Sequence, residues 1–422
     1  MNTGQRRYMK KQSNTPQIRF HNYKELWECD RLKNIFRTIR NAFVGTATPY
    51  YVEKGHFYLE SNNVKNGKIN YNSQIFINDE FYEKQRDKWL KMNDIVMVQS
   101  GHVGHTAVIP KELNNTAAHA LIVFTDYKKE VNPHFLNYQF QSSSKRKELD
   151  LISTGNTIKH ILASEMKSFK MDFPTVEEQS AIGSLFRTLD DLLASYKDNL
   201  VNYQTLKETM LSKMFPKSGQ TVPEIRLDGF KGEWEINKLN KYLTVSKQKN
   251  TQLKFDKEDV LSVSGEFGII NQIQFQGRSF AGASVEMYSI VDTGNIVYTK
   301  SPLKANPYGI IKTNYGIPGI VSTLYAVYLP NENVFPGFVE RYFENDLRLN
   351  SYLKPLVNKG AKNDMKVSDE NALLGAVIFP QLEEQVAISD YFTNLDKFIQ
   401  SHKDKISQLE TLKKKLLQDM FI

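Results

Sequence analysis

The chain contains an internal repeat, and this repeat constrains its fold more than any other feature. Residues 173–215 align without a gap with residues 379–421, and 19 of the 43 aligned positions are identical. Both segments begin with Phe-Pro, carry a Glu-Glu-Gln triplet near the start and finish with Met-Phe. A match of this length and identity indicates two copies of one structural unit.

A second pair of matching segments lies at the start of each copy. Residues 16–36 align with residues 223–243, where 7 of 21 positions are identical, including an Ile-Arg pair and a Trp-Glu pair. The offsets of 207 and 206 give a unit of about 206 residues that occurs twice. Between the matched ends, residues 37–172 and 244–378 have almost no similarity. We therefore expect a constant frame, made by the matched segments, that holds two different interiors.

Both matched C-terminal segments carry apolar residues at every seventh position, which is typical of a coiled coil. Pro174 and Pro380 mark the helix starts, and Thr175 with Glu178 fits a capping box. About 38 residues at 1.5 Å each predict a rod of roughly 55–60 Å. The alternative is a pair of unrelated amphipathic helices, each packed on its own domain. The first segment has Ile182, Leu189, Tyr196, Tyr203 and Met210 with Phe186, Leu193, Leu200 and Met214, and the second has Ile388, Leu395, Leu409 and Leu416 with Phe392, Ile399, Ile406 and Met420.

Further apolar residues lie outside this seam, so the apolar stripe is wider than a two-stranded coiled coil needs. We expect them to contact a partner protein. They are Leu185, Leu192, Leu206, Tyr391, Phe398 and Leu412.

The junction between the two copies is short, because only about seven residues separate Phe215 from Pro223. The end of the first helix is therefore expected close to the start of the second globular domain. If a pseudo-two-fold axis relates the halves, Phe421 lies close to Pro16 and the two helices run antiparallel.

Charge is unevenly distributed along a chain whose net charge is +8. Residues 177–215 hold four basic and six acidic side chains, and residues 383–422 hold six and seven, so the remainder carries +11. If DNA is the partner, we expect the globular domains to contact it and the helices to meet protein.

Composition excludes several classes of protein. Apolar residues make up 40% of the chain, with 25 Phe and 21 Tyr, which is enough for buried cores and excludes global disorder. The single cysteine, Cys29, excludes a disulfide framework and argues against a cysteine-based zinc site. No apolar run approaches 18 residues and no signal-peptide core is present, so we expect a soluble cytoplasmic protein with no membrane association.

Each interior reads as mixed α/β with short strands, and each has a strand-like run that is followed by a polar loop. Residues 95–105 contain Ile-Val-Met-Val and then a Gln-Ser-Gly-His loop, and residues 296–302 contain Ile-Val-Tyr-Thr and then Lys-Ser-Pro. Glycine-containing loops at 155–157 and 360–363 precede the two Phe-Pro pairs at similar spacing. Proline in the second polar loop stands where the first has glycine, which predicts a different loop conformation.

The order of these motifs resembles the specificity subunit of type I restriction-modification systems. Each half has an Ile-Arg…Trp-Glu opening, a divergent interior with a strand and polar loop, a glycine loop, and a Phe-Pro-x-x-Glu-Glu-Gln-x-x-Ile helix start. The match covers nearly the whole chain, and the doubled helix start is its most specific mark. The resemblance implies an α+β fold, in which two mixed α/β target-recognition domains are joined by two long antiparallel coiled-coil helices in an internal pseudo-two-fold repeat.

The resemblance also implies an order of domains along the chain. The expected segments are a flexible basic N-terminal tail over residues 1–15, target-recognition domain 1 over 16–173, coiled-coil helix 1 as central spacer over 174–216, target-recognition domain 2 over 217–378, and coiled-coil helix 2 as distal spacer over 379–422.

In this family each target-recognition domain would read one half of a split, asymmetric sequence in double-stranded DNA. The helices would set the spacer and dock two modification (methyltransferase) subunits. Restriction subunits, which are ATP-dependent translocases and nucleases, would complete an adenine-specific methyltransferase and endodeoxyribonuclease. The chain itself would be non-catalytic and hold no cofactor, with S-adenosylmethionine, ATP and Mg on the partner subunits.

Base readout needs polar side chains presented to the edges of the bases, and glycine allows the backbone to approach DNA closely. A turn that only faces solvent is the alternative for each loop. The candidates are Gln99, Ser100, Gly101, His102, His105, Gly155, Asn156, Thr157 and Lys159 in the first domain, and Lys300, Ser301, Lys304, Tyr308, Lys312, Gly360, Lys362 and Asn363 in the second.

The sequence carries no recognisable catalytic motif. Asn306-Pro307-Tyr308 lacks the second proline of an adenine methyltransferase motif, and Asn66-Gly67-Lys68-Ile69 lacks the Gly and Ser/Thr of a phosphate-binding loop. His102 and His105 lack the glutamate of a metalloprotease motif. The alternative functions are a self-contained methyltransferase or nuclease with an unrecognised active site, and a purely structural coiled-coil adaptor.

Overall fold

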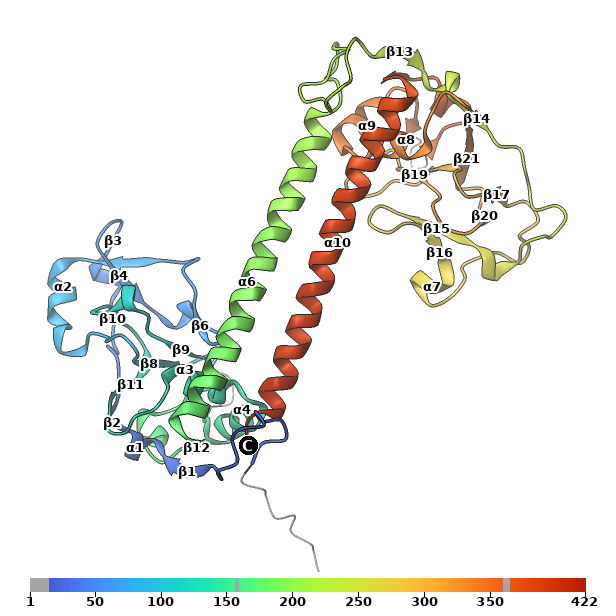
Figure 1. Cartoon of the computed structure of the whole chain (residues 1–422). Helices are drawn as coiled ribbons and strands as arrows, with labels where there is room; N and C mark the ends of the chain where they lie inside the picture. The colour runs from blue at the N-terminus through green and yellow to red at the C-terminus, as the bar shows by residue number, and fades with distance from the viewer. Residues whose placement is uncertain (1–14, 156–158, 360–364) are drawn as a thin grey trace, which may run out of the picture. The chain divides into compact units, whose positions relative to one another are not determined.

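Two long helices, α6 (Val176–Lys213) and α10 (Leu382–Asp419), are the longest elements in Figure 1. The computed structural model describes residues 15–155, 159–359 and 365–422. Each helix spans 38 residues, so the helix length expected from the heptad pattern is confirmed.

The chain divides into two compact units. Unit 1 combines the chain up to Lys197 with Asp404–Ile422, and unit 2 is the stretch Asp198–Lys403. Each unit therefore contains part of α6, part of α10 and one globular interior. Each unit thus includes a stretch of long helix that belongs, in sequence, to the other copy of the repeat.

The interior of unit 1 is built on two four-stranded sheets. One sheet has the order β2-β11-β8-β9, and the other has the order β10-β4-β7-β3. The elements of unit 1 before α6 are β1 (Glu28–Arg31), α1 (Leu32–Ile35), β2 (Phe36–Asn41), β3 (Tyr51–Val52), β4 (His56–Leu59), β5 (Val64–Lys65), β6 (Lys68–Ile69), β7 (Ile75–Ile77), α2 (Asp79–Lys84), β8 (Ile95–Val98), β9 (Thr106–Val108), β10 (Ala117–Ala118), β11 (Leu121–Tyr127), α3 (Pro133–Gln141), α4 (Ser143–Ile152), α5 (Ala163–Met166) and β12 (Lys170–Phe173).

The interior of unit 2 contains one four-stranded sheet of order β14-β21-β18-β19 and several two-stranded pairs. Its elements before α10 are β13 (Glu235–Lys238), β14 (Leu243–Val245), β15 (Leu261–Ser264), β16 (Gly268–Asn271), α7 (Gln272–Gln276), β17 (Ser289–Val291), β18 (Ile296–Thr299), β19 (Ile311–Thr313), β20 (Gly319–Val321), β21 (Tyr325–Pro330), α8 (Pro336–Phe343), α9 (Asp346–Leu353), β22 (Asn358–Lys359), β23 (Met365–Lys366) and β24 (Ala376–Phe379).

The two dissimilar interiors each contain an antiparallel sheet with the same strand arrangement. In unit 1, β11 lies between β2 and β8, and β9 follows on the outer side of β8. In unit 2, β21 lies between β14 and β18, and β19 follows on the outer side of β18. The strands predicted at Ile95–Val98 and Ile296–Thr299 are confirmed and occupy equivalent positions. The interiors have almost no sequence similarity, yet in each of them the polar loop follows the equivalent strand of an equivalent sheet.

The stretches of α6 and α10 run antiparallel within each unit, as predicted. In unit 1, Lys413 Nζ lies 2.6 Å from Asp190 Oδ1, and Lys197 Nζ lies 2.6 Å from Glu410 Oε1. In unit 2, Lys207 Nζ lies 2.6 Å from Asp396 Oδ1, at the positions equivalent to Lys413 and Asp190. The seam is apolar where the heptads predict it, because Ile182, Phe186, Leu189 and Leu193 are buried in unit 1, and Ile388, Phe392, Leu395 and Ile399 are buried in unit 2.

The C-terminal end of each long helix is hydrogen-bonded to the opening segment of a globular domain. Ile18 N–H donates to Asp419 O at 2.9 Å in unit 1, and Ile225 N–H donates to Lys213 O at 3.0 Å in unit 2. The C-terminal end of the chain therefore lies beside the segment that begins at Pro16, as the repeat predicts.

The same helix ends supply a large aromatic side chain to each core. Phe421 packs against Trp27, Phe135 and Phe186 in unit 1, with ring centroids 6.4, 5.6 and 5.8 Å away. Phe215 packs against the equivalent Trp234, Phe338 and Phe392 in unit 2. Burying a large aromatic side chain contributes on the order of 2 kcal/mol, so each unit gains stability from helix that the other copy of the repeat contributes.

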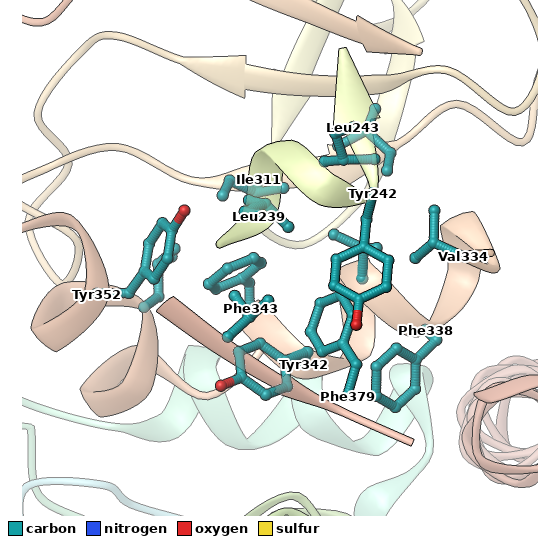
Figure 2. Close-up of a cluster of buried hydrophobic side chains, with 14 of the residues drawn as sticks. Leu239, Tyr242, Leu243, Ile311, Val334, Phe338, Tyr342, Phe343, Tyr352 and Phe379 are labelled. Atoms are coloured by element: carbon teal, nitrogen blue, oxygen red, sulfur yellow. The ribbon is translucent and has the colours of Figure 1, made fainter. Parts of the chain in front are cut away.

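The core of unit 2 is rich in aromatic side chains that converge on one space. Figure 2 shows Tyr242, Phe338, Tyr342 and Phe379 grouped together, with Tyr242 and Phe379 having ring centroids 4.9 Å apart. Phe338 meets the Phe379 ring edge-on at 5.0 Å, which is a favoured geometry for aromatic pairs. Strand β24, which carries Phe379, thereby connects the core to the start of α10.

A buried ion pair joins the opening segment of each unit to the first turn of its long helix. Arg19 Nε and Nη2 donate to the two oxygens of Glu178, both at 2.7 Å, and Glu178 has no exposed side-chain surface. Arg226 binds Glu384 in the same two-pronged way at 2.8 and 2.7 Å. We call these two contacts the Arg–Glu clasps.

The last residue of the Glu-Glu-Gln triplet has a structural role in both units. Gln179 accepts from Asn132 N–H at 3.0 Å and donates to Pro174 O at 2.9 Å. Gln385 accepts from Phe335 N–H and donates to Pro380 O, both at 2.9 Å. Each glutamine thus holds the start of a short helix, α3 or α8, against the start of a long one.

The predicted capping box at the start of α6 is half present. Thr175 Oγ1 accepts from Glu178 N–H at 3.4 Å, as a capping box requires. The carboxylate of Glu178 binds Arg19 through both oxygens and is described with no bond to the Thr175 backbone. Two charge-assisted hydrogen bonds to the Arg19 guanidinium stabilise the Glu178 carboxylate more than one bond to the Thr175 backbone would, which explains why the capping box is incomplete.

Removing a clasp arginine should destabilise its unit strongly. We expect Arg19→Ala to lower the free energy of unfolding by about 3 kcal/mol, because the buried Glu178 loses its counter-ion. Lys197→Ala removes an exposed pair with Glu410 and should cost under about 1 kcal/mol. Urea unfolding of the two variants measures both values. Equal stability of the two variants would contradict a structural role for the clasp.

Candidate nucleic-acid interface

The structure brings the polar loop of unit 1 beside residues 159–161, which follow the predicted glycine loop. The loop 99–105 connects β8 to β9, and its outer edge lies against residues 159–161. Gly101 N–H donates to Lys159 O at 3.1 Å, and Ile161 N–H donates to Gln99 O at 2.9 Å. These backbone bonds hold the polar loop beside the segment that follows the glycine at 155. Two stretches that are about 60 residues apart in the sequence therefore form one surface, which we call the unit 1 loop surface.

Glycine is needed at both glycine positions in the polar loop. Gly101 and Gly104 have φ values of +79° and +76°, which side chains rarely adopt. Nothing lies within 4 Å of a Cβ built on Gly101, so the backbone there is open to a close approach. At Gly104 the same Cβ would lie 3.1 Å from Leu149, so packing restricts that position.

His105 lies at the end of this loop with its ring nitrogens in distinct environments. Its Nδ1 lies 3.2 Å from the backbone nitrogen of Asn66 and 3.2 Å from Nη2 of Arg146. Both of those groups are donors, so Nδ1 must accept and the proton must lie on Nε2. Burial lowers the pKa of His105 to about 4, and the neighbouring Arg146, His102 and Lys65 act in the same direction. His105 is therefore a neutral side chain with one hydrogen-bond donor.

The other predicted residues of unit 1 divide into three groups. Gln99 and Ser100 are half-buried, whereas Gly101, His102 and Gly155 are exposed. Lys159 is exposed, but its ammonium lies 3.0 Å from Asp150. Asn156 and Thr157 lie outside the described residues.

The polar loop of unit 2 is longer and is shaped differently, as the proline predicted. It runs from Lys300 to the start of β19 at Ile311 and folds back through Leu303 N–H, which donates to Asn306 O at 3.0 Å. Gly309 has a φ of +92°, and a Cβ there would lie 1.9 Å from Thr299 O, so only glycine fits. Gly309 was not among the predicted residues, although a glycine before a strand is a recognisable turn signal.

The predicted residues of unit 2 are less uniform than those of unit 1. Lys304 is exposed, and Ser301 and Tyr308 are half-buried. Lys300 donates to Asp369 at 2.9 Å. The ammonium of Lys312 lies 3.2 Å from Glu340 in a pair that is 11% and 9% exposed, so this lysine is committed to the core and we leave it out of the interface. Gly360, Lys362 and Asn363 lie outside the described residues.

Three further residues that the sequence did not reveal lie at the unit 1 loop surface. Asn66 comes from the turn between β5 and β6, Arg146 comes from α4, and His160 pairs with Ser100 in an isolated bridge. Neither Asn66 nor Arg146 is near the loop in sequence. No local motif could therefore have assigned them.

The expected partner-binding residues on the long helices fall into two sets. Leu185 and Tyr391 are half-buried and pack against the cores of units 1 and 2. Leu192, Leu206, Phe398 and Leu412 are 43%, 37%, 55% and 44% exposed. The exposed four are available to a partner, and the other two also stabilise their own unit.

No group of three or more His, Cys, Asp or Glu side chains within the described ranges could hold a metal ion. None of the helices in that part of the chain is both long and apolar enough to cross a bilayer.

Comparisons with known proteins agree with the motif order and the fold. Residues 25–203 match the family described as Type I restriction modification DNA specificity domain. The MjaX type I restriction enzyme specificity subunit of Methanocaldococcus jannaschii is 23% identical over 418 residues, which cover 93% of this chain and 92% of that protein. The EcoBI specificity subunit of Escherichia coli is 23% identical over 210 residues, covering 48% of this chain and 44% of that protein.

A solved structure has the same fold. The S subunit of a type I restriction-modification system from M. genitalium superposes with a TM-score of 0.59 at 15% identity, covering 97% of this chain and 99% of that one. The doubled helix start and the equivalent sheets of the two units agree with these matches, so the chain is similar in sequence and in fold to type I restriction-modification specificity subunits.

Proposed function

We propose that residues 16–173 and 217–378 each read one half of a split, asymmetric DNA sequence. The observation that supports this proposal is that both units have a sheet of the same strand arrangement, whereas the polar loops on these sheets differ. Strands β8 and β18 are equivalent, yet the loops after them differ in length, charge and glycine position. Equivalent scaffolds with different polar loops are what two unlike half-sites require, because base identity is read by side chains at the groove edges.

The long helices, residues 174–216 and 379–422, act in this proposal as the spacer between the half-sites. They also dock two modification subunits through the exposed residues Leu192, Leu206, Phe398 and Leu412. Exposed large apolar side chains on a helix are favourable protein contacts once desolvated. Restriction subunits complete the assembly in the cytoplasm, and S-adenosylmethionine, ATP and Mg bind the partner subunits.

In the first domain we assign the contact surface to Gln99–His102, His105, Gly155 and Lys159, with Asn156 and Thr157 as sequence-based candidates. In the second we assign it to Lys300, Ser301, Lys304 and Tyr308, with Gly360, Lys362 and Asn363 as sequence-based candidates.

His105 illustrates how a loop residue restricts base choice. A neutral imidazole whose Nδ1 is occupied can only donate, through Nε2–H. In the major groove it can therefore pair with the N7 or O6 of guanine, the N7 of adenine or the O4 of thymine, and it cannot accept from the amino groups of adenine or cytosine.

Exchanging one interior should change one half of the target. We expect replacement of residues 37–172 by the equivalent segment of another family member to alter one half of the methylated sequence and preserve the other. Sequencing of methylated adenines in DNA from cells that express the full system measures this. The wild-type chain in the same cells is the control. A change in both halves would contradict independent reading.

Lengthening the helices should change the gap between the half-sites. Insertion of one heptad into both α6 and α10 at equivalent positions preserves the apolar seam and adds about 10 Å of helix. We expect the methylated sites to keep both half-sites and to change their separation. If the separation stays the same, the helices do not set the spacer.

The fixed proton of His105 predicts an unusual pH response. Because its folded pKa is about 4, its imidazole should keep the Nε2–H form from pH 8 to pH 5 in a nitrogen NMR titration. An unfolded histidine takes up its proton near pH 6.5, so His105 makes the fold less stable as the pH falls from 6.5 towards 4. His105→Gln should remove that part of the pH dependence. Titration of His105 near pH 6.5 would contradict the assigned environment.

A further inference from the structure

Unit 1 contains a cationic crevice of about 640 Å³ beside the loop surface. It lies between the β5–β6 hairpin, α4 and the paired stretches of α6 and α10. The lining includes the apolar side chains Leu193 and Leu417, and most of its charged side chains are basic. The cations are Lys65, Lys68, Arg146, Lys197, Lys413 and Lys414, against the carboxylates of Asp190 and Glu410.

The two carboxylates neutralise only some of these cations. Asp190 binds Lys413 at 2.6 Å and lies 3.8 Å from Lys68, and Glu410 binds Lys197 at 2.6 Å.

Lys65, Arg146 and Lys414 are different, because none of them has a carboxylate oxygen within 4.0 Å among the described residues. The described hydrogen bond of the Arg146 guanidinium is to the neutral ring of His105. The nearest carboxylate that acts on Arg146 is Asp150, which is paired with Lys159, so the partly buried guanidinium is only partly neutralised and the crevice is suited to an anionic ligand.

Several positions of unit 2 that correspond to the crevice carry a carboxylate or an apolar side chain in place of a cation or a neutral polar group. The frame aligns Lys414 with Glu208, and the matched helix pairs α3–α4 and α8–α9 align Arg146 with Leu349. By the same alignment, Gln141 and Ser143 correspond to Glu344 and Asp346. Both units keep the lysine–aspartate pair between the long helices. Since unit 2 folds on the same frame without the extra cations, folding of the frame does not require them in unit 1.

The position of the crevice indicates what the anion is. Arg146 and Asn66 line the crevice and also contact Nδ1 of His105, the last residue of the polar loop. The crevice is therefore continuous with the unit 1 loop surface. DNA seated on that surface would bring its phosphates, which lie one per 1.7 Å of duplex axis, next to Lys65, Arg146 and Lys414.

We propose that this crevice binds the DNA phosphate backbone beside the half-site read by residues 16–173, and that unit 2 makes no equivalent contact. This proposal rests on the proposed function. It assigns sequence-independent attraction to unit 1, in addition to base reading by both units. Each phosphate contact adds about −0.9 to the slope of log affinity against log salt, so Lys65 and Lys414 together account for a slope of about −2.

The test is DNA binding by the full chain in complex with its modification subunits. Lys65→Gln combined with Lys414→Gln removes two exposed charges without opening the core. We expect the slope to become shallower by about 2, so that the wild-type complex loses about tenfold more affinity than the variant between 50 and 200 mM salt. Specific and nonspecific DNA should be affected alike, and the methylated sequence should stay the same.

A matched variant controls for net charge alone. Lys397→Gln with Lys403→Gln removes two exposed lysines from the unit 2 stretch of α10, and its slope should equal that of the wild type. The proposal is overturned if the two double variants have the same slope. It is also overturned if the crevice variant keeps wild-type DNA binding and fails to assemble with the modification subunits, which would assign the crevice to an acidic protein segment. Failure of the proposed function would look different, because the wild-type complex itself would then show no sequence preference.

Discussion

The Arg–Glu clasps are the contacts on which the rest of each unit depends. Glu178 is wholly buried in the first turn of α6, where the helix dipole favours a negative charge but cannot replace a counter-ion. Arg19 supplies that counter-ion from the opening segment and also donates to Glu25 O at 2.6 Å. A buried pair of this kind adds little net stability, yet any arrangement that separates it leaves a charge in the core. The clasp therefore selects one register between the opening segment and the helix, and β1 then pairs with β12.

That register also allows the C-terminal end of α10 to pack on the opening segment of unit 1. Once Ile18 is placed, its N–H can bond to Asp419 O, and Phe421 enters the core beside Trp27. The cost of closing a loop grows only with the logarithm of its length, so recruiting Asp404–Ile422 across some 200 residues costs little more than recruiting a nearby segment. The buried side chains of Leu409, Met420 and Phe421 offset that cost. Unit 2 repeats the arrangement with Leu211, Met214 and Phe215.

Local pattern predicted the frame well and the interface only in part. Heptads and the doubled triplet located both long helices, and short apolar runs located β8 and β18, because these signals lie within one stretch of sequence. The shared sheet was not predictable, since strand pairing is set by long-range packing rather than by residue identity. The interface suffers from the same limit. Lys312 was a candidate DNA contact, but Glu340 from α8 binds it, and Arg146, which no sequence pattern singled out, lies against His105.

The contrast between the two units shows where the frame leaves sequence free to vary. Positions that pack or close the units are kept in both copies, as with Lys413 and Lys207 against Asp190 and Asp396. Exposed positions next to those contacts need only be polar or fill space. One example is Lys414 of unit 1, which corresponds to Glu208 in unit 2. Rim charge can therefore be set by what binds outside without disturbing the fold. Base-reading loops give specificity, whereas unpaired cations give attraction that every sequence shares. In the proposed arrangement, confining the cations to one unit would limit that common attraction, and a larger fraction of the binding free energy would depend on reading both half-sites.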